Sequence, residues 1–250
     1  MLDIISNALS LLVIITAHEL GHYIAARRYG IIPPTFSVGF GPTLYAFLYK
    51  GTQFKFCPIP FGGAVSIPPA ELENLTSRKQ ISILLAGPLA NLVLSICISI
   101  TMVMIGAVPK TISHLSLLNQ SVVVVIGTIF FFTIGAPATI LSLAKIALHP
   151  INNIDDVSGP ISILTGKSIP ESMLSEDSYI ARLLITTYIL SLGIGTLNLL
   201  PLSILDGGRI ARVLFSRFPK FNTVWTLGTS VILALLVCYV LIGDAVKLFA

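Results

Sequence analysis

The chain has 250 residues, of which 54% are hydrophobic and only 10% are charged. A soluble domain normally carries about 25% charged residues, so this composition excludes an ordinary soluble protein and indicates a membrane domain with several spans. The net charge of +4 comes from loops between apolar runs and forms no basic stripe, which argues against a nucleic-acid partner.

Apolar segments long enough to cross about 30 Å of hydrocarbon, which takes roughly 20 helical residues, recur along the chain. They cover residues 4–28, 81–108, 179–205 and 224–249. A further apolar stretch, residues 122–148, is interrupted by Gly135 and Pro137, where a break is expected. We expect this stretch to enter the membrane and return, or to lie along its interface.

Residues 31–69 differ from the spans because they are rich in Gly, Pro and aromatic residues. Within them, residues 43–49 and 52–57 are two β-prone runs around a Lys-Gly pair, which predicts a β-hairpin. Gly62 and Gly63 then indicate a tight turn or a close backbone approach. The segment is too apolar for an ordinary loop, so we expect a β region associated with the membrane.

These elements predict an all-α polytopic membrane protein with about four transmembrane helices, a membrane-associated β-hairpin region and a re-entrant or interfacial segment. We expect residues 1–250 to form a single membrane-embedded domain.

The first span contains His-Glu-Leu-Gly-His at residues 18–22. Residues four apart on a helix share a face, so His18 and His22 can bind one metal ion. Glu19 lies beside them and can act as a general base toward a water molecule. The alternative is that the histidines are satisfied core residues, but ionisable groups in a span are costly and favour the functional interpretation.

A catalytic zinc ion takes three protein ligands and keeps one position open for water. Asp206 follows a long apolar run and precedes two glycines, so it either completes a metal site or ends a helix as a turn residue. Its position alone leaves both possibilities open. The other candidates, most of them in polar or boundary loops, are His114, His149, Glu71, Glu73, Asp155 and Asp156.

Several motifs, taken in their order along the chain, resemble those of the site-2 protease family of intramembrane zinc metalloproteases. The likeness is closest to the bacterial regulator-of-sigma-E protease branch, and it covers essentially the whole chain. The matching motifs are HELGH at residues 18–22, FGG at 61–63, GPLAN at 87–91, SGPI at 158–161, and NLLP followed by LDGG within 198–208.

The resemblance implies hydrolysis of peptide bonds in or near the transmembrane segments of membrane proteins. It implies one zinc ion per chain, bound by His18, His22 and Asp206, with Glu19 as the catalytic base. It also implies that Asn198 lines the active site and contacts the substrate backbone, whereas the alternative for Asn198 is a helix–helix hydrogen bond. The rival function is a non-enzymatic metal transporter or an inactive membrane scaffold, since His and Asp in spans also mark ion pathways.

The expected partners are the lipid bilayer and single-span membrane proteins as substrates. A helical substrate must unwind before cleavage, and we expect an unpaired strand within residues 43–57, in the β region near Thr52, Gln53 and Phe54, to hold the unwound segment by β-augmentation. For Gly87 and Asn91 we prefer a helix-packing role.

The chain departs from the family pattern in three respects. Ser203 stands where a second proline is usual, and Arg209 stands where this branch often has histidine. The branch commonly carries PDZ domains between the second and third core helices, whereas this chain has no PDZ-like pattern there. Gating of substrate entry by a PDZ domain is therefore not expected.

The metal site also constrains the topology. Zinc–ligand bonds of about 2 Å require His18, His22 and Asp206 to lie at one depth. The helices that carry them must then run in the same direction, with an odd number of crossings between them, so residues 122–148 should not form a complete crossing. Basic residues follow both helices, and the positive-inside rule places the active site nearer the cytoplasmic face. We expect a multi-pass protein of the bacterial inner membrane.

Overall fold

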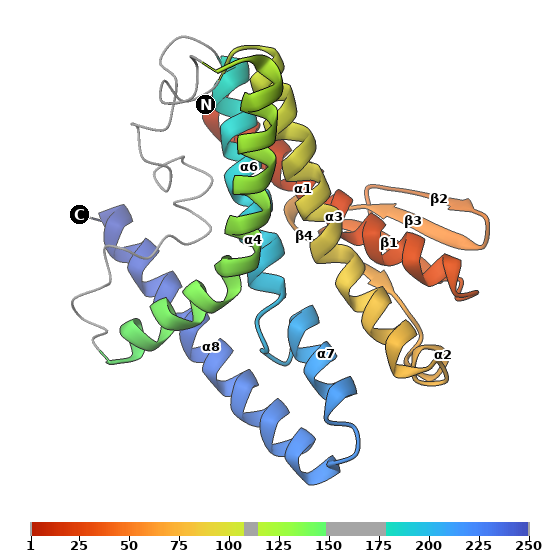
Figure 1. The fold of residues 1–250 in the computed structure, drawn as a ribbon. Helices are drawn as coiled ribbons and strands as arrows, with labels where there is room; N and C mark the ends of the chain where they lie inside the picture. The colour runs from red at the N-terminus through yellow and green to blue at the C-terminus, as the bar shows by residue number, and fades with distance from the viewer. Residues whose placement is uncertain (1, 108–114, 149–178, 250) are drawn as a thin grey trace.

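The computed structural model describes residues 2–107, 115–148 and 179–249. Long helices dominate this part of the chain, and one small β-sheet projects from their side (Figure 1). The helices are α1 (Leu2–Arg28), α2 (Pro69–Glu73), α3 (Ser77–Met104), α4 (Leu117–Leu148), α6 (Tyr179–Asn198), α7 (Asp206–Leu214) and α8 (Pro219–Phe249).

Four helical segments are long and apolar enough to cross a membrane, which confirms the predicted polytopic helical fold. They are Ile5–Arg28, Ser77–Met104, Leu117–Gly135 and Tyr179–Asn198. Helix α3 packs against α1, α4 and α6 and so occupies the middle of the bundle. Helices α1 and α6 run in the same direction, as the metal-site argument requires, and α3 runs in the opposite direction (Figure 1).

The stretch predicted to be re-entrant or interfacial lies in one continuous helix, α4, which bends along its length (Figure 1). The 19 residues of Leu117–Gly135 qualify as a span by themselves, because 19 residues at about 1.5 Å each reach about 28 Å. Pro137 lies inside the helix without ending it, as a proline that removes one backbone hydrogen bond can do. The return of the chain from Leu148 to Tyr179 lies outside the described residues.

The two C-terminal spans differ in detail from the prediction. Helix α6 ends at Asn198 and not near residue 205, since Pro201 cannot continue a helix. Residues 224–249, expected as the fourth span, lie within α8, where Asn222–Leu235 is a shorter apolar stretch.

Hydroxyl groups join the helices of the bundle. Ser10 Oγ of α1 lies 2.9 Å from Thr187 Oγ1 of α6, and Ser191 Oγ of α6 donates to the carbonyl of Asn91 in α3 at 3.0 Å. In a membrane, such small polar contacts help helices associate because lipid removes the hydrophobic driving force. Through them α6 holds α1 and α3 in a fixed relation.

The sheet has four strands: β1 (Thr35–Phe40), β2 (Tyr45–Tyr49), β3 (Thr52–Phe56) and β4 (Ile59–Ser66). Their order is β2-β3-β1-β4, with β1 parallel to β3 and antiparallel to β4. The predicted hairpin is confirmed as β2 and β3. Its turn residues Lys50 and Gly51 have φ angles of 48° and 83°, as a two-residue hairpin turn of type I′ requires.

Strand β4 forms the edge of the sheet that faces α1. Gly62 and Gly63 lie inside this strand, so the predicted tight turn is wrong, but the predicted close approach is confirmed. A Cβ atom at Gly63 would lie 2.8 Å from Ile15 Cγ2 and 2.9 Å from the carbonyl oxygen of Ser37. Glycine therefore allows the edge strand to lie directly against the helix that carries the HExxH motif.

Candidate active site

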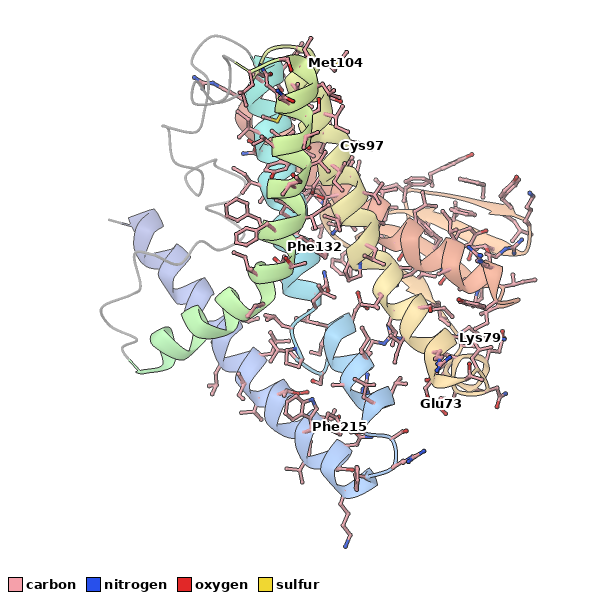
Figure 2. All side chains as sticks on the ribbon, viewed as in Figure 1. Glu73, Lys79, Cys97, Met104, Phe132 and Phe215 are labelled. Carbon is pink, nitrogen blue, oxygen red and sulfur yellow. The ribbon has the colours of Figure 1, made fainter. Side chains whose placement is uncertain are left out.

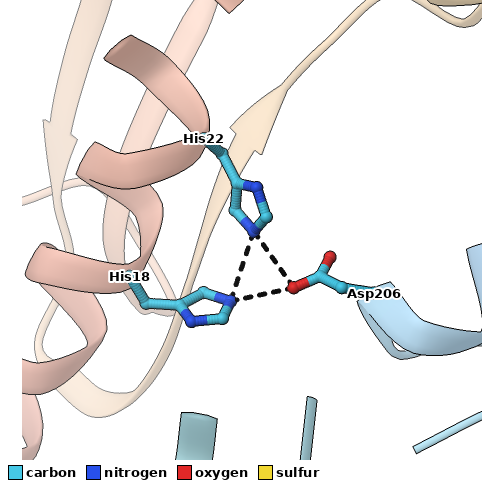
Figure 3. Close-up of side chains that lie close together, drawn as sticks. All are labelled: His18, His22 and Asp206. Atoms are coloured by element: carbon cyan, nitrogen blue, oxygen red, sulfur yellow. Dashed lines mark hydrogen bonds and ion pairs between the residues drawn. The ribbon is translucent and has the colours of Figure 1, made fainter. Parts of the chain in front are cut away.

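The two histidines of the HExxH motif lie one turn apart on α1 and point toward the same place (Figure 3). Both are buried, and their Nε2 atoms are 3.3 Å apart. The sequence predicted this shared face from the helical period alone. Helix α1 can bring them so close to α3 because Gly21 has no side chain, and a Cβ atom there would overlap the carbonyl of Ala86.

The third member of the cluster is Asp206, the first residue of α7. Its Oδ2 atom lies 3.1 Å from His18 Nε2 and 3.1 Å from His22 Nε2, and all three side chains are buried (Figure 3). The structure thus brings Asp206 to the histidines. Glu71 and Glu73 lie exposed on or beside α2, whereas the remaining candidates fall outside the described residues: His114, His149, Asp155 and Asp156.

The turn before α7 is tightly packed and fixes the direction of the Asp206 side chain. Cβ atoms at Gly207 and Gly208 would overlap the carbonyls of Leu199 and Leu202, so only glycine fits at both positions. The N-terminus of a helix also favours a negative charge, because its free N–H groups carry partial positive charge. These features place a carboxylate opposite the two imidazoles.

Helix α3 contacts both imidazole rings at their Nδ1 atoms. The Nδ1 atom of His22 donates to the carbonyl of Ile83 at 2.8 Å, so Nε2 is the ring nitrogen that faces Asp206. Asn91, which is fully buried, places its side-chain Nδ2 atom 3.3 Å from Nδ1 of His18. Gly87 lies between these two contacts, and a Cβ atom there would overlap His22 Nε2.

This arrangement fits a bound metal ion. Two imidazole nitrogens and one carboxylate oxygen lie within 4.8 Å of one another, and this is a donor set that zinc commonly takes. The lone pair of His22 Nε2 and the Asp206 carboxylate face each other at 3.1 Å, so a proton or a metal cation must lie between them. The space in front of Gly87 adjoins these donor atoms.

The charge of Asp206 agrees with the presence of a cation between its carboxylate and His22 Nε2. Burial alone would raise the pKa of the Asp206 carboxyl group. The hydrogen bonds from His18 and His22, and the positive charge of these rings when protonated, outweigh burial and hold this pKa well below its usual range. Asp206 therefore stays ionised and attracts a cation.

Glu19 is held by the edge strand of the sheet. Its Oε2 atom accepts a hydrogen bond from the backbone N–H of Val65 in β4 at 2.9 Å. The carboxylate of the predicted base thus lies between the helix with both histidines and the edge strand β4.

The predicted substrate-binding residues lie in the inner strand of the hairpin. Thr52, Gln53 and Phe54 belong to β3, which pairs with β2 on one side and β1 on the other. Because both edges of β3 are occupied, a substrate cannot add to β3 itself. Strand β2 of the same hairpin lies at the outer edge of the sheet, so substrate pairing within residues 43–57 stays a prediction. Asn198 ends α6, where its Nδ2 atom donates to the carbonyl of Ile194 in the same helix at 3.0 Å, and its role stays a prediction.

Sequence reasoning assigned Gly87 and Asn91 to helix packing, whereas both touch the histidine cluster. Their place in the GPLAN motif was the available signal.

The structure also explains the departure at Ser203. Its N–H donates to Thr229 Oγ1 at 3.2 Å and its Oγ lies 2.7 Å from Ser230 Oγ, so it ties the segment before Asp206 to α8. A proline has neither donor.

Comparisons with known proteins agree with this site. A family model described as peptidase family M50 matches residues 6–239. Relatives from Campylobacter jejuni, Ralstonia nicotianae and Mesorhizobium japonicum are 35%, 33% and 38% identical over 107, 128 and 112 residues. The matches cover 38%, 43% and 35% of this chain but only 29%, 28% and 30% of the relatives, whose names assign them provisionally as zinc metalloproteases. Because the family model matches most of its length, the chain belongs to peptidase family M50, the site-2 protease family.

Proposed function

We propose that this protein is an intramembrane zinc metalloprotease, which hydrolyses peptide bonds in or near the transmembrane segments of single-span membrane proteins. The observation that carries the proposal is the buried triangle of His18, His22 and Asp206, with Glu19 on the next position of the same helix. Family membership and the relatives' names support a zinc metalloprotease.

His18, His22 and Asp206 would hold one zinc ion through Nε2, Nε2 and Oδ2. When bound there, zinc supplies a Lewis acid that activates water and polarises the scissile carbonyl. Glu19 accepts the proton of the attacking water and later donates it to the nitrogen of the leaving amine. The buried N–H and C=O contacts of α3 keep the imidazoles in place during both steps.

We further propose that the unwound substrate segment pairs with the outer edge of β4. This strand ends the sheet, lies against α1, and points the N–H of Val65 toward Glu19 and away from its partner strand β1. An edge strand offers a row of free main-chain groups for β-augmentation. A substrate on this edge would run directly past the base.

The bilayer is the expected second partner of the β region. All five residues of β2 are exposed, and Leu44 and Leu48 have 69% and 75% of their surface accessible. Such a large apolar surface on a hairpin is unusual next to water and suits the membrane interface.

We place the protein in a bacterial inner membrane with the active site nearer the cytoplasm. Helix α3 carries Lys79 at one end and apolar Met104 at the other (Figure 2). The end with Lys79 is also the end toward which α1 runs, where Arg27 and Arg28 lie in its last turn (Figure 1). The positive-inside rule assigns this end to the cytoplasm.

The test compares wild-type protein with Glu19→Gln and with the exposed control Glu71→Gln. We expect Glu19→Gln to keep its zinc and to lose cleavage by about 10²–10⁴-fold, because a general base contributes that much. Comparative proteomics of membranes should then reveal single-span proteins that accumulate only with Glu19→Gln. A zinc-loaded protein that moves metal across vesicles and cleaves nothing would favour the transporter alternative.

A further inference from the structure

We propose that Asn91 is a positioning residue of the metal site, whose side-chain oxygen accepts the Nδ1–H of His18 and so keeps the Nε2 lone pair free for the metal. The inference rests on the proposed role of His18 as a metal ligand. It assigns a chemical task to a residue that the sequence placed in helix packing.

The Asn91 side chain has its amide nitrogen, and not its oxygen, toward His18. The Nδ2 atom of Asn91 lies 3.3 Å from His18 Nδ1, while its Oδ1 atom is buried and has no hydrogen-bond partner among the described residues. An N–H that donates to Nδ1 forces the ring proton onto Nε2, where it faces the Asp206 carboxylate at 3.1 Å. This tautomer cannot bind a metal through Nε2.

A half-turn of the Asn91 amide group allows the tautomer of His18 that can bind a metal through Nε2. The oxygen and nitrogen of an asparagine side chain have nearly the same shape and exchange places by rotation about χ2. After the exchange, Oδ1 lies opposite His18 Nδ1 and accepts a hydrogen bond from the Nδ1–H. The oxygen that lacked a partner thereby gains a donor. Helix α3 then offers one oxygen to each imidazole, from Asn91 to His18 and from the carbonyl of Ile83 to His22.

The backbone of Asn91 is fixed while its amide group turns. The carbonyl of Asn91 accepts hydrogen bonds from Ser95 Oγ at 2.8 Å and from Ser191 Oγ at 3.0 Å. These bonds come from its own helix and from α6, so they hold the residue at the place where both helices meet α1. The amide therefore stands at a constant distance from His18.

A purely structural role and the proposed positioning role predict different effects of two substitutions. Asn91→Leu keeps a side chain of similar size and removes the acceptor. Asn91→Asp keeps an acceptor and removes the donor, so it can only receive the His18 Nδ1–H. If the amide nitrogen were the group that matters, Asp would repel the Nδ1 lone pair and be the more harmful change.

The experiment measures the zinc dissociation constant of the purified full chain by competition with a chelator. We expect Asn91→Leu to bind zinc about 10–100-fold more weakly, as is typical when the hydrogen-bond partner of a metal-binding histidine is lost. We expect Asn91→Asp to bind zinc at least as tightly as wild type. The control is Ser99→Ala, a buried polar residue of α3 whose hydroxyl donates to the nearby carbonyl of Ile96, and it should leave the constant unchanged.

Thermal unfolding of the zinc-free proteins separates packing from positioning. A packing role would lower the unfolding temperature of Asn91→Leu and leave its zinc constant at the wild-type value, and this result overturns the inference. An Asn91→Asp protein that binds zinc as weakly as Asn91→Leu also overturns it. If wild-type protein binds no zinc at all, the proposed function itself fails. That outcome is distinct from the two results that overturn the positioning role of Asn91.

Discussion

Replacement of Gly87 by alanine tests whether the space beside the histidines belongs to a metal. A methyl group at this position would lie 2.6 Å from His22 Cε1 and 2.8 Å from His18 Nε2, and closer still to His22 Nε2. Ordinary van der Waals contact begins at 3.4 Å, so His18 Nε2 must retreat by 3.4 − 2.8 = 0.6 Å. Metal sites tolerate ligand displacements of only about 0.2 Å.

The zinc affinity of Gly87→Ala should therefore fall by more than about 100-fold. This exceeds the effect on metal affinity that is usual when a hydrogen-bond partner of a metal ligand is replaced. The matched control is Gly193→Ala in α6, where a Cβ atom has no neighbour within 4 Å. Glycine-to-alanine changes in an open helix usually stabilise it by up to about 1 kcal/mol, so this control should bind zinc normally. The assay is elemental analysis of purified protein equilibrated with a zinc buffer. Normal zinc binding by Gly87→Ala would refute the reasoning.

Three further predictions follow from the site and the topology. Asp206→Ala should lower zinc occupancy and Glu73→Ala should not, as measured by metal analysis; equal occupancy in both would remove Asp206 from the metal site. Val65→Pro should lower cleavage without loss of zinc, because proline removes a donor that points away from the sheet. Unchanged cleavage by this variant would argue against substrate pairing on β4. Single cysteines at Lys50 and Leu117, in a background without the native cysteines, should react with impermeant labels from opposite sides of the membrane, and reaction from the same side would contradict the proposed orientation.

The helices and the HExxH pair could be predicted from the sequence because both depend on local spacing. His18 and His22 share a face through the helical period, and the apolar runs have the length of a span. Asp206 needed the family resemblance, since 188 residues separate it from His18 and no local pattern joins them. Whether α4 crosses the membrane stays a prediction, because Pro137 suggested a break whereas the 19 apolar residues before it are long enough for a span.

The sheet was only half predicted, for a physical reason. The hairpin of β2 and β3 has a compact turn signal, but β1 contains Gly39 at a φ of 83° and β4 contains Pro60 and two glycines. Glycine and proline weaken the alternating pattern by which strands are recognised. The roles of Gly87 and Asn91 were missed because they arise only where α1 crosses α3, and sequence spacing within one helix cannot reveal such a crossing.

The distance along the chain between the histidines and Asp206 has a consequence for the synthesis of the protein. Chains grow at about 5–20 residues per second, so the 188 residues between His18 and Asp206 take roughly 10–40 seconds to make. During this time α1 lacks its carboxylate partner, and the proposed zinc site has only two of its three ligands. On the proposed mechanism, the chain can cleave a peptide bond only after α7 has docked beside α3.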